Sequence, residues 1–328
     1  MSLGGAALIF LISAASCLAV GRPAIRALVR AQCVAPRRYE DCLPLMAYQQ
    51  GKQQTPTMGG LFVLGVGTLV AVAAGGLAYR EGWLVLGAVI GMGTVGLFDD
   101  YLKFRHANAA GLRGGPKLLI ALAIGAWLGL ASSAGSTDVG ALELPWMHRT
   151  IALGWGWIPF AMLVVAGCAH AVNLTDGMDG LAAGCVAVAL SVLGLWAMRG
   201  DPHGRVVVAW CASLAGACVG FLWFNSFPAS VYLGDVGALG LGAALGAISL
   251  LTRTALWLVI IGGVFVVEAL SVMLQVASYK WCGKRRVFRV APLHHHFHLG
   301  GTSEPKLIVR FWIVGVMLAM LSLTTALP

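Results

Sequence analysis

Four short polar segments interrupt a chain that is otherwise apolar, and their residue types suit phosphate and metal chemistry. They are LFDDYLK with Asp99 and Asp100, NLTDGMDG with Asn173, Asp176 and Asp179, YLGDVG with Asp235, and APLHHHFH with His294, His295 and His296. The chain has only 13 acidic residues in 328. A carboxylate at the end of a hydrophobic span is costly unless a cation compensates it. The expected cation is a divalent metal that holds a phosphorylated substrate.

Asp99 and Asp100 are adjacent carboxylates at the end of an apolar run. Held about 4 Å apart at an effective dielectric near 20, they would repel by about 4 kcal/mol, so a cation or a shared proton must relieve them. Neighbouring residues of a helix point in different directions, so one of the pair is expected to face the site while the other orients it. The alternative is a solvated pair at a helix end with Lys103 as its counter-ion.

NLTDGMDG combines an amide and two carboxylates at i, i+3 and i+6, which would share one face if the segment is helical. Gly177 and Gly180 would let a ligand approach the backbone closely. Such a group could hydrogen-bond a base or a sugar hydroxyl, or bind a metal. The alternative is a polar turn between two apolar spans.

Asp235 lies between Gly234 and Gly237 at the entry to a glycine-rich helix, with Asn225 ten residues earlier. The first amides of a helix favour anions, so an aspartate here would repel a phosphate unless a metal lay between them. Hard oxygen ligands with room for water and phosphate favour Mg²⁺ or Mn²⁺ over zinc.

Three consecutive histidines suggest zinc at first sight. Sequence neighbours rarely converge on one ion, however, so imidazoles that donate to a diphosphate beside the basic loop 280–289 fit better. Glu268, inside an apolar span, is a candidate functional residue, with a hydrogen-bonded packing role as the alternative. His170 is expected to be structural.

The composition predicts an all-α, polytopic integral membrane protein. The chain is 59% hydrophobic and 11% charged, and its mean hydropathy is +0.85. Its apolar runs could cross roughly 30 Å of hydrocarbon about ten times. Candidate helices are 3–20, 59–78, 83–98, 117–133, 154–172, 180–198, 206–224, 231–250, 255–279 and 307–327. We expect one transmembrane domain, 1–328, with two longer cytoplasmic loops at 21–58 and 280–306, and a first span that is retained.

Basic residues predict the orientation. Of the 22 lysines and arginines, 17 lie in loops that follow odd-numbered spans and five lie on the other side. Cytoplasmic loops carry the excess, so both termini are expected outside. The aspartate and histidine segments follow spans three, five, seven and nine, which predicts one cytoplasmic site at the inner membrane.

Longer segments around these residues resemble one enzyme family. They are TPTMGG (55–60), GLFDDYLK (96–103), AVNLTDGMDGLA (171–182), FLWFNSFPASVYLGDVGALGLG (221–242), GGVFVVEALSVMLQV (262–276) and FRVAPLHHHF with EPKLIVRFWI (288–313). The chain is similar to the polyprenyl-phosphate N-acetylhexosamine-1-phosphate transferases, and APLHHHF followed by EPK resembles the branch that carries phospho-MurNAc-pentapeptide. Ala238 and His298 depart from the residues common in that branch.

The resemblance implies a Mg²⁺-dependent transfer of phospho-MurNAc-pentapeptide from UDP-MurNAc-pentapeptide to undecaprenyl phosphate, which gives lipid I and UMP for peptidoglycan synthesis. It implies Asp235 as the metal ligand, Asp99 and Asp100 as the pair that places or deprotonates the lipid phosphate, and His294 as a catalytic diphosphate contact. The implied substrate-binding residues are Lys52, Thr57, Asn173, Asp176, Asp179, Asn225, His294, His295 and His296. It also implies a homodimer among membrane lipids, and no nucleic-acid partner is expected.

Three other interpretations stay open. A sister transferase would use UDP-GlcNAc or another UDP-sugar. A metal or anion transporter would use the same side chains, although the acidic groups lie at helix ends and no paired broken helices are evident. A noncatalytic scaffold would be expected to have lost an acidic site residue.

Overall fold

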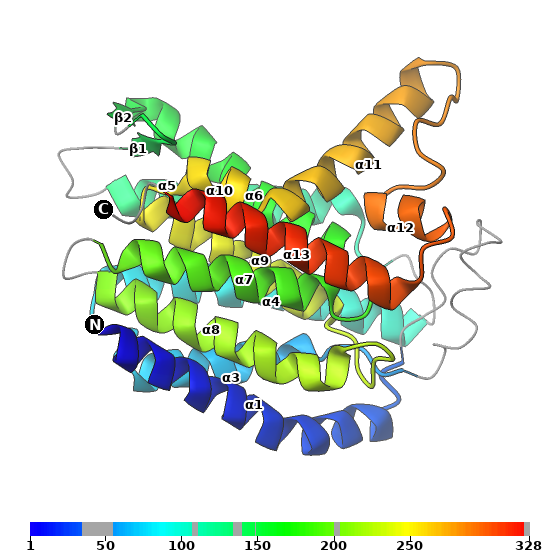
Figure 1. Ribbon diagram of the computed structural model, residues 1–328, viewed down its shortest axis with the longest axis horizontal. Helices are drawn as coiled ribbons and strands as arrows, with labels where there is room; N and C mark the ends of the chain where they lie inside the picture. Colours follow the sequence, from blue (N-terminus) through cyan, green and yellow to red (C-terminus); the bar gives the residue numbers. More distant parts are fainter. Residues whose placement is uncertain (35–54, 107–110, 134–139, 148, 200–203, 325–328) are drawn as a thin grey trace.

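Apolar helices form nearly all of the structure, a computed structural model that describes residues 1–34, 55–106, 111–133, 140–147, 149–199 and 204–324 (Figure 1). In chain order the helices are α1 (Leu3–Arg30), α3 (Gly60–Ala73), α4 (Arg80–His106), α5 (Gly114–Ser133), α6 (Trp157–Thr175), α7 (Leu181–Ala197), α8 (Gly204–Asn225), α9 (Gly234–Leu251), α10 (Ala255–Ile261), α11 (Gly263–Trp281), α12 (Leu293–His298) and α13 (Glu304–Leu323). A 3₁₀ turn (Gly154–Gly156) precedes α6.

The helices are long and apolar enough for a polytopic membrane protein, as predicted. Within the described residues, eight are at least 18 residues long with the hydropathy of a membrane span, and α3 and α7 are shorter apolar helices. Their outer faces expose large apolar side chains such as Leu69, Leu119 and Leu163. In lipid these faces need no further protein cover.

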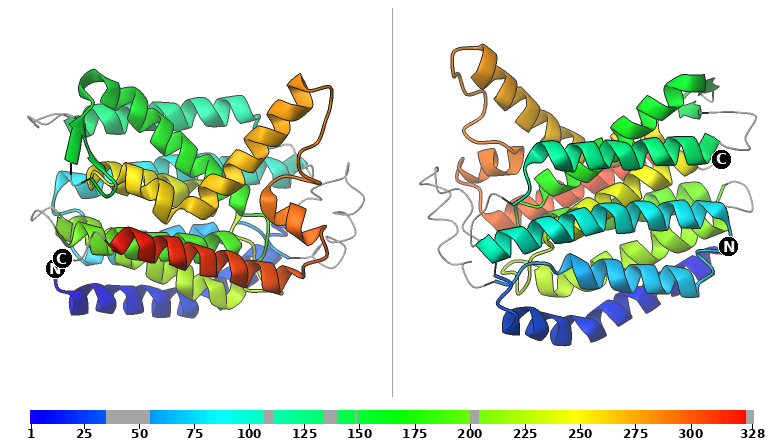
Figure 2. Two further views of the ribbon diagram at one scale, coloured as in Figure 1. Left: turned by 45° about the horizontal axis from the view of Figure 1, so that its top comes forward. Right: turned by 180° about the vertical axis from the view of Figure 1, so that it is seen from behind.

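The ninth predicted span, 255–279, is not one helix. It divides into α10 and α11 at the pair Gly262–Gly263, and α11 leans away from the bundle (Figures 1 and 2). Glycine is a poor helix former and a glycine pair is a common site of a kink, which explains why the apolar run does not continue straight. The break directs the first turns of α11 toward the histidine segment.

Helix α9 is the centre of the bundle, with nearly every residue buried between α4, α6 and α3. Glycines let the backbones approach. A Cβ on Gly96 of α4 would lie 2.2 Å from the carbonyl oxygen of Asp235, and one on Gly242 of α9 would lie 2.6 Å from Cα of Ala169. Close packing through small residues replaces the hydrophobic effect that is missing between helices in lipid.

A short hairpin between α5 and α6 was not predicted. Strands β1 (Ala141–Leu144) and β2 (Arg149–Ala152) pair antiparallel, with Leu142 opposite Ile151. The hairpin is tied to the bundle because the Glu143 amide donates to the Arg253 carbonyl at 3.3 Å and the ring of Trp146 packs on Trp257 at 5.2 Å. Four-residue strands leave too short an alternation to be recognised in the sequence.

The two predicted longer loops also contain helix. Helix α1 continues to Arg30, well into the predicted loop 21–58, and the loop 280–306 contains α12. Basic residues in the last turns of α1 complement the negative end of the helix dipole, so the helix extends past its apolar part. The start of α1, the end of α13 and the hairpin lie at one end of the bundle, and α12 lies at the other (Figure 1).

Candidate active site

Three buried carboxylates converge at the α12 end of the bundle. Helix α4 supplies Asp99 and Asp100 near its C-terminus, and the first turn of α9 supplies Asp235. Each offers an oxygen within 4.8 Å of the others, and their exposed fractions are 0%, 2% and 4%. The predicted meeting of these two segments is confirmed, because the close α4–α9 contact at Gly96 brings the helix ends together.

Two lysines partly neutralise the carboxylate cluster, which we define as Asp99, Asp100 and Asp235. The Nζ of Lys103 lies 2.5 Å from Asp99 and 3.0 Å from Asp235, and the Nζ of Lys117 lies 2.8 Å from Asp99 and 2.9 Å from Asp235. Sequence spacing points to Lys103, which is four residues after Asp99. Lys117 opens α5, and no sequence pattern links it to the cluster.

The cluster suits a divalent cation. With every group ionised, three carboxylates face two ammonium groups, which leaves one excess negative charge. The oxygens are hard ligands that could bind Mg²⁺ while substrate oxygens and water complete the coordination. Lys103 and Lys117 supply part of the positive charge that the three carboxylates require, and a bound metal ion would supply the rest. The residues present therefore fit a metal site.

Asp100 also shapes the site. Its Oδ2 accepts the Val236 amide at 3.1 Å, so it caps the N-terminus of α9 from the neighbouring helix. Gly234 has a φ of +75°, and a Cβ there would lie 2.7 Å from Asp100 Oδ2 and 3.0 Å from the hydroxyl of Thr57. Thr57, a predicted substrate residue, is therefore buried beside this cap.

Asn173 joins the carboxylate cluster from α6. Its Nδ2 donates to Asp235 Oδ2 at 3.2 Å. Helix α6 ends at Thr175, however, so Asn173, Asp176 and Asp179 do not share a helical face. Asp176 caps the C-terminus of α6 and is partly buried. The chain then turns through Gly177 and Gly180, and the φ of Gly180 is +77°.

Asp179 and Asn225 hold the loop that leads to α9. The Asp179 carboxylate accepts the Ala229 amide at 3.0 Å, and the Asp179 amide donates to Glu304 at 3.0 Å. Asn225 donates to the Val231 carbonyl at 2.8 Å. Both residues were predicted to bind substrate, and their described contacts position the segment that carries Asp235.

The three histidines take different positions. His294 is fully buried and its Nδ1 lies 3.1 Å from a carboxylate oxygen of Glu268. His295 is buried with its ring centroid 4.2 Å from that of His294. His296 accepts the Arg289 amide at 3.1 Å. The Nδ1 atoms of His294 and His296 therefore engage different partners, and among the described residues the group that could hold a metal ion is the three carboxylates and not the histidines.

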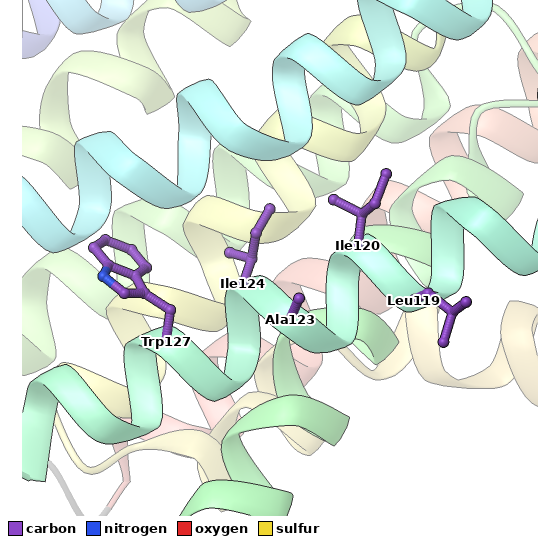
Figure 3. A pocket seen from close by; sticks show the side chains of 5 residues that line it. All are labelled: Leu119, Ile120, Ala123, Ile124 and Trp127. Atoms are coloured by element: carbon purple, nitrogen blue, oxygen red, sulfur yellow. The ribbon is translucent and has the colours of Figure 1, made fainter.

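Three features remain: Lys52, His170, which is close enough to the cluster for the charges of Lys117 and Asp235 to act on it, and a groove on α5. Lys52 lies outside the described residues. His170 is on α6, and its Nε2 is buried. An apolar groove follows the outer face of α5, lined by Leu119, Ile120, Ala123, Ile124 and Trp127 (Figure 3). Its lining offers no group that could bind a metal or a nucleotide.

Comparison with known proteins identifies the family. Residues 82–253, from α4 to the end of α9, match Glycosyl transferase family 4. Proteins named phospho-N-acetylmuramoyl-pentapeptide-transferase are similar over most of the chain. The Thermodesulfovibrio yellowstonii protein is 43% identical over 84% of this chain and 80% of its own length. The chain belongs to the phospho-N-acetylmuramoyl-pentapeptide transferases.

Other phospho-N-acetylmuramoyl-pentapeptide transferases give the same result. The protein of Citrifermentans bemidjiense is 44% identical over 84% of this chain, and that of Methylacidiphilum infernorum is 40% identical over 94% of this chain and 89% of its own length. The Glycosyl transferase family 4 match contains the carboxylate cluster, Lys103, Lys117 and Asn173. It ends before α11 and α12, which contribute Glu268 and His294 to this transferase.

Proposed function

We propose that this protein transfers phospho-MurNAc-pentapeptide from UDP-MurNAc-pentapeptide to undecaprenyl phosphate, which forms lipid I and releases UMP. The observation that carries the proposal is the carboxylate cluster with its two lysines at one end of a membrane bundle, in a chain of this family. A soluble nucleotide and a lipid phosphate can meet at such a membrane boundary. Transfer between them requires that the phosphates are neutralised and aligned.

The side chains divide this work. Lys103 and Lys117 supply positive charge for the phosphates that approach the cluster. Asp99 and Asp100 place the lipid phosphate and accept its proton. We favour direct attack of the lipid phosphate oxygen on the phosphorus bonded to the sugar: a new P–O bond forms, the bond to UMP breaks, and UMP leaves with the electron pair.

Mg²⁺ is the proposed cofactor, held by Asp235 with Asp99 and Asp100 beside it. When bound, it would neutralise charge on the diphosphate of the donor. Asn173 supports this assignment because its amide nitrogen donates to Asp235 and fixes the orientation of that carboxylate.

The donor nucleotide is proposed to bind next to the turn 176–180. His294 and His295 are assigned to the diphosphate side, and His296 is assigned to substrate binding. Lys52, Thr57, Asn173, Asp176, Asp179 and Asn225 are assigned to the nucleotide side. For Asp179 and Asn225 the described hydrogen bonds favour an indirect contribution through the loop 226–233.

We propose that the cluster faces the cytoplasm and that both termini lie outside. Cys282 is exposed beyond the end of α11, and Trp155 is 90% exposed near the hairpin at the opposite end. In a protein with Cys33 and Cys42 replaced by serine, an impermeant maleimide should label Cys282 only after the cells are permeabilised. With Trp155→Cys added, intact cells should be labelled. The reverse pattern would invert the orientation.

A homodimer is proposed on the family resemblance. Light scattering with refractive-index and absorbance detection separates the protein mass from the detergent. A protein mass near twice 34.2 kDa is expected, and a mass of one chain would overturn the dimer.

The reaction is tested with purified protein in detergent, given Mg²⁺, undecaprenyl phosphate and UDP-MurNAc-pentapeptide. Release of UMP with formation of the lipid-linked product is expected. Release only from UDP-GlcNAc would favour the sister transferase. Cation uptake into liposomes without UMP release would favour a transporter.

A further inference from the structure

Glu268 is a fully buried carboxylate on α11, outside the carboxylate cluster, and it engages one histidine twice. One of its oxygens accepts the His294 backbone amide at 3.1 Å, and the other lies 3.1 Å from Nδ1 of the same ring. A carboxylate without a proton can only accept, so Nδ1 is the nitrogen that bears hydrogen. Both the backbone and the ring of His294 are therefore held by one side chain.

The other ring nitrogen points at the substrate-binding turn. His294 Nε2 is buried and has no hydrogen-bond partner within the described part of the chain. A Cβ added to Gly177 would lie 2.2 Å from this nitrogen, so the ring faces the backbone of the turn 176–180. Asn173, four residues before Gly177, donates to Asp235. The segment 173–177 therefore contacts the carboxylate cluster at Asn173 and the His294 ring at Gly177.

We propose that Glu268 is a positioning residue of the transfer reaction, which fixes the His294 ring so that Nε2 donates to the diphosphate of the donor. This inference rests on the proposed function. A buried, unpartnered ring nitrogen is costly in the free protein, and a diphosphate oxygen would satisfy it by accepting its hydrogen when Nε2 is protonated. When Nε2 carries a proton as well as Nδ1, the ring is positive, and the adjacent Glu268 carboxylate compensates that charge.

The kinetic test compares Glu268→Gln with Ser271→Ala in the UMP-release assay. The glutamine keeps the size of the side chain and removes its charge, whereas the serine change removes another buried hydrogen bond on α11, from Ser271 to the Glu268 carbonyl at 2.7 Å. We expect the glutamine variant to lose about tenfold to a hundredfold in kcat with a smaller change in KM, as for other residues that orient an active group. The serine variant should stay within about threefold of the wild type.

A second measurement reads the ring directly and does not depend on activity. In protein labelled with ¹⁵N-histidine, the long-range ¹H–¹⁵N spectrum should contain the signal of a ring with a protonated Nδ1 that disappears in His294→Asn and is thereby distinguished from the ring of His298, whose Nδ1 lies 3.2 Å from the Thr302 carbonyl oxygen. That signal should shift in Glu268→Gln and stay in place in Ser271→Ala. Gly177→Ala should also shift it, because the new methyl group would displace the ring.

The outcomes separate the inference from the proposed function. Wild-type protein that releases no UMP would contradict the function. If the wild type is active, a kcat of Glu268→Gln equal to that of Ser271→Ala would overturn the positioning role. Unchanged His294 ring signals in Glu268→Gln would overturn it whether or not the wild type is active.

Discussion

The ammonium of Lys117 lies 2.8 Å from Asp99 on α4 and 2.9 Å from Asp235 on α9. One side chain of α5 therefore joins two helices whose carboxylates would otherwise repel. Because its Nζ is within reach of both, Lys117 determines how much negative charge remains for a metal or a phosphate.

Asp235→Asn should lower turnover on the order of a thousandfold, as expected for loss of a central electrostatic group. The asparagine keeps the size of the side chain, so thermal unfolding should show a folded protein. The concentration of Mg²⁺ needed for half-maximal activity should rise. Near-normal turnover would remove Asp235 from the proposed metal site.

Lys117→Met should destabilise the protein by about 3 kcal/mol, because it leaves two buried carboxylates with fewer positive neighbours. The same loss increases the excess negative charge of the cluster. Added Mg²⁺ should therefore raise the melting temperature of this variant more than that of the wild type. Lys280→Met, at an exposed position, is the control and should change neither quantity. An equal Mg²⁺ response in wild type and Lys117→Met would contradict the assignment.

Gly60→Ala should reduce both stability and turnover. A Cβ at Gly60 would lie 2.2 Å from the backbone of Gly237, two residues after Asp235, so α3 and α9 would have to separate. Gly65→Ala on the same helix is the matched control, since a Cβ there has nothing within 4 Å. The control should be neutral or stabilising by up to about 1 kcal/mol. Both variants are compared with the wild type by thermal unfolding and by UMP release. Equal melting temperatures and equal turnover for Gly60→Ala and Gly65→Ala would show that the contact between α3 and α9 tolerates a methyl group.

Cys33 should react slowly with iodoacetamide. Burial raises the pKa of its thiol, and the negative charge of Asp100 raises it further. A raised pKa means less thiolate at a given pH, so the rate of alkylation should rise only at higher pH than for an ordinary thiol. Asp100→Asn removes one of the two causes and should move the rate profile to lower pH.

Mass spectrometry of the alkylated peptides measures this effect. Cys282, exposed beyond the end of α11, is the internal control, and its profile should be the same in wild type and Asp100→Asn. A Cys33 profile that does not move would show that Asp100 carries no charge that the thiol senses.

Helix parity explains why the site could be anticipated. Asp99 lies at the end of one span and Asp235 at the start of another, and the apolar runs alone locate both spans. Because consecutive spans cross in opposite directions, every connection from an odd-numbered to an even-numbered span lies at the same end of the bundle. That relation is geometric, so it holds without knowledge of packing. The orientation of those ends relative to the cytoplasm stays a prediction from the basic residues.

The structural contributions of Asp179 and Lys117 could not be anticipated. Asp179 appeared to extend a helical face, but the chain turns at Gly177 and Gly180, and its carboxylate binds a loop amide. Lys117 reaches the cluster because α5 packs beside α4 and α6. Neither relation has a period or spacing in the sequence, since both depend on residues far apart along the chain.

The sequence by itself determined the membrane-spanning class, the segments that carry charge and the end of the bundle at which they gather, because apolar length and alternating crossings are local properties of the chain. The tertiary structure decided which atoms meet: two lysines among three carboxylates, and Glu268 of α11 beside His294 of α12. These contacts depend on how closely helices pack through their glycines and where one helix bends, and such distances arise only when the whole bundle is assembled.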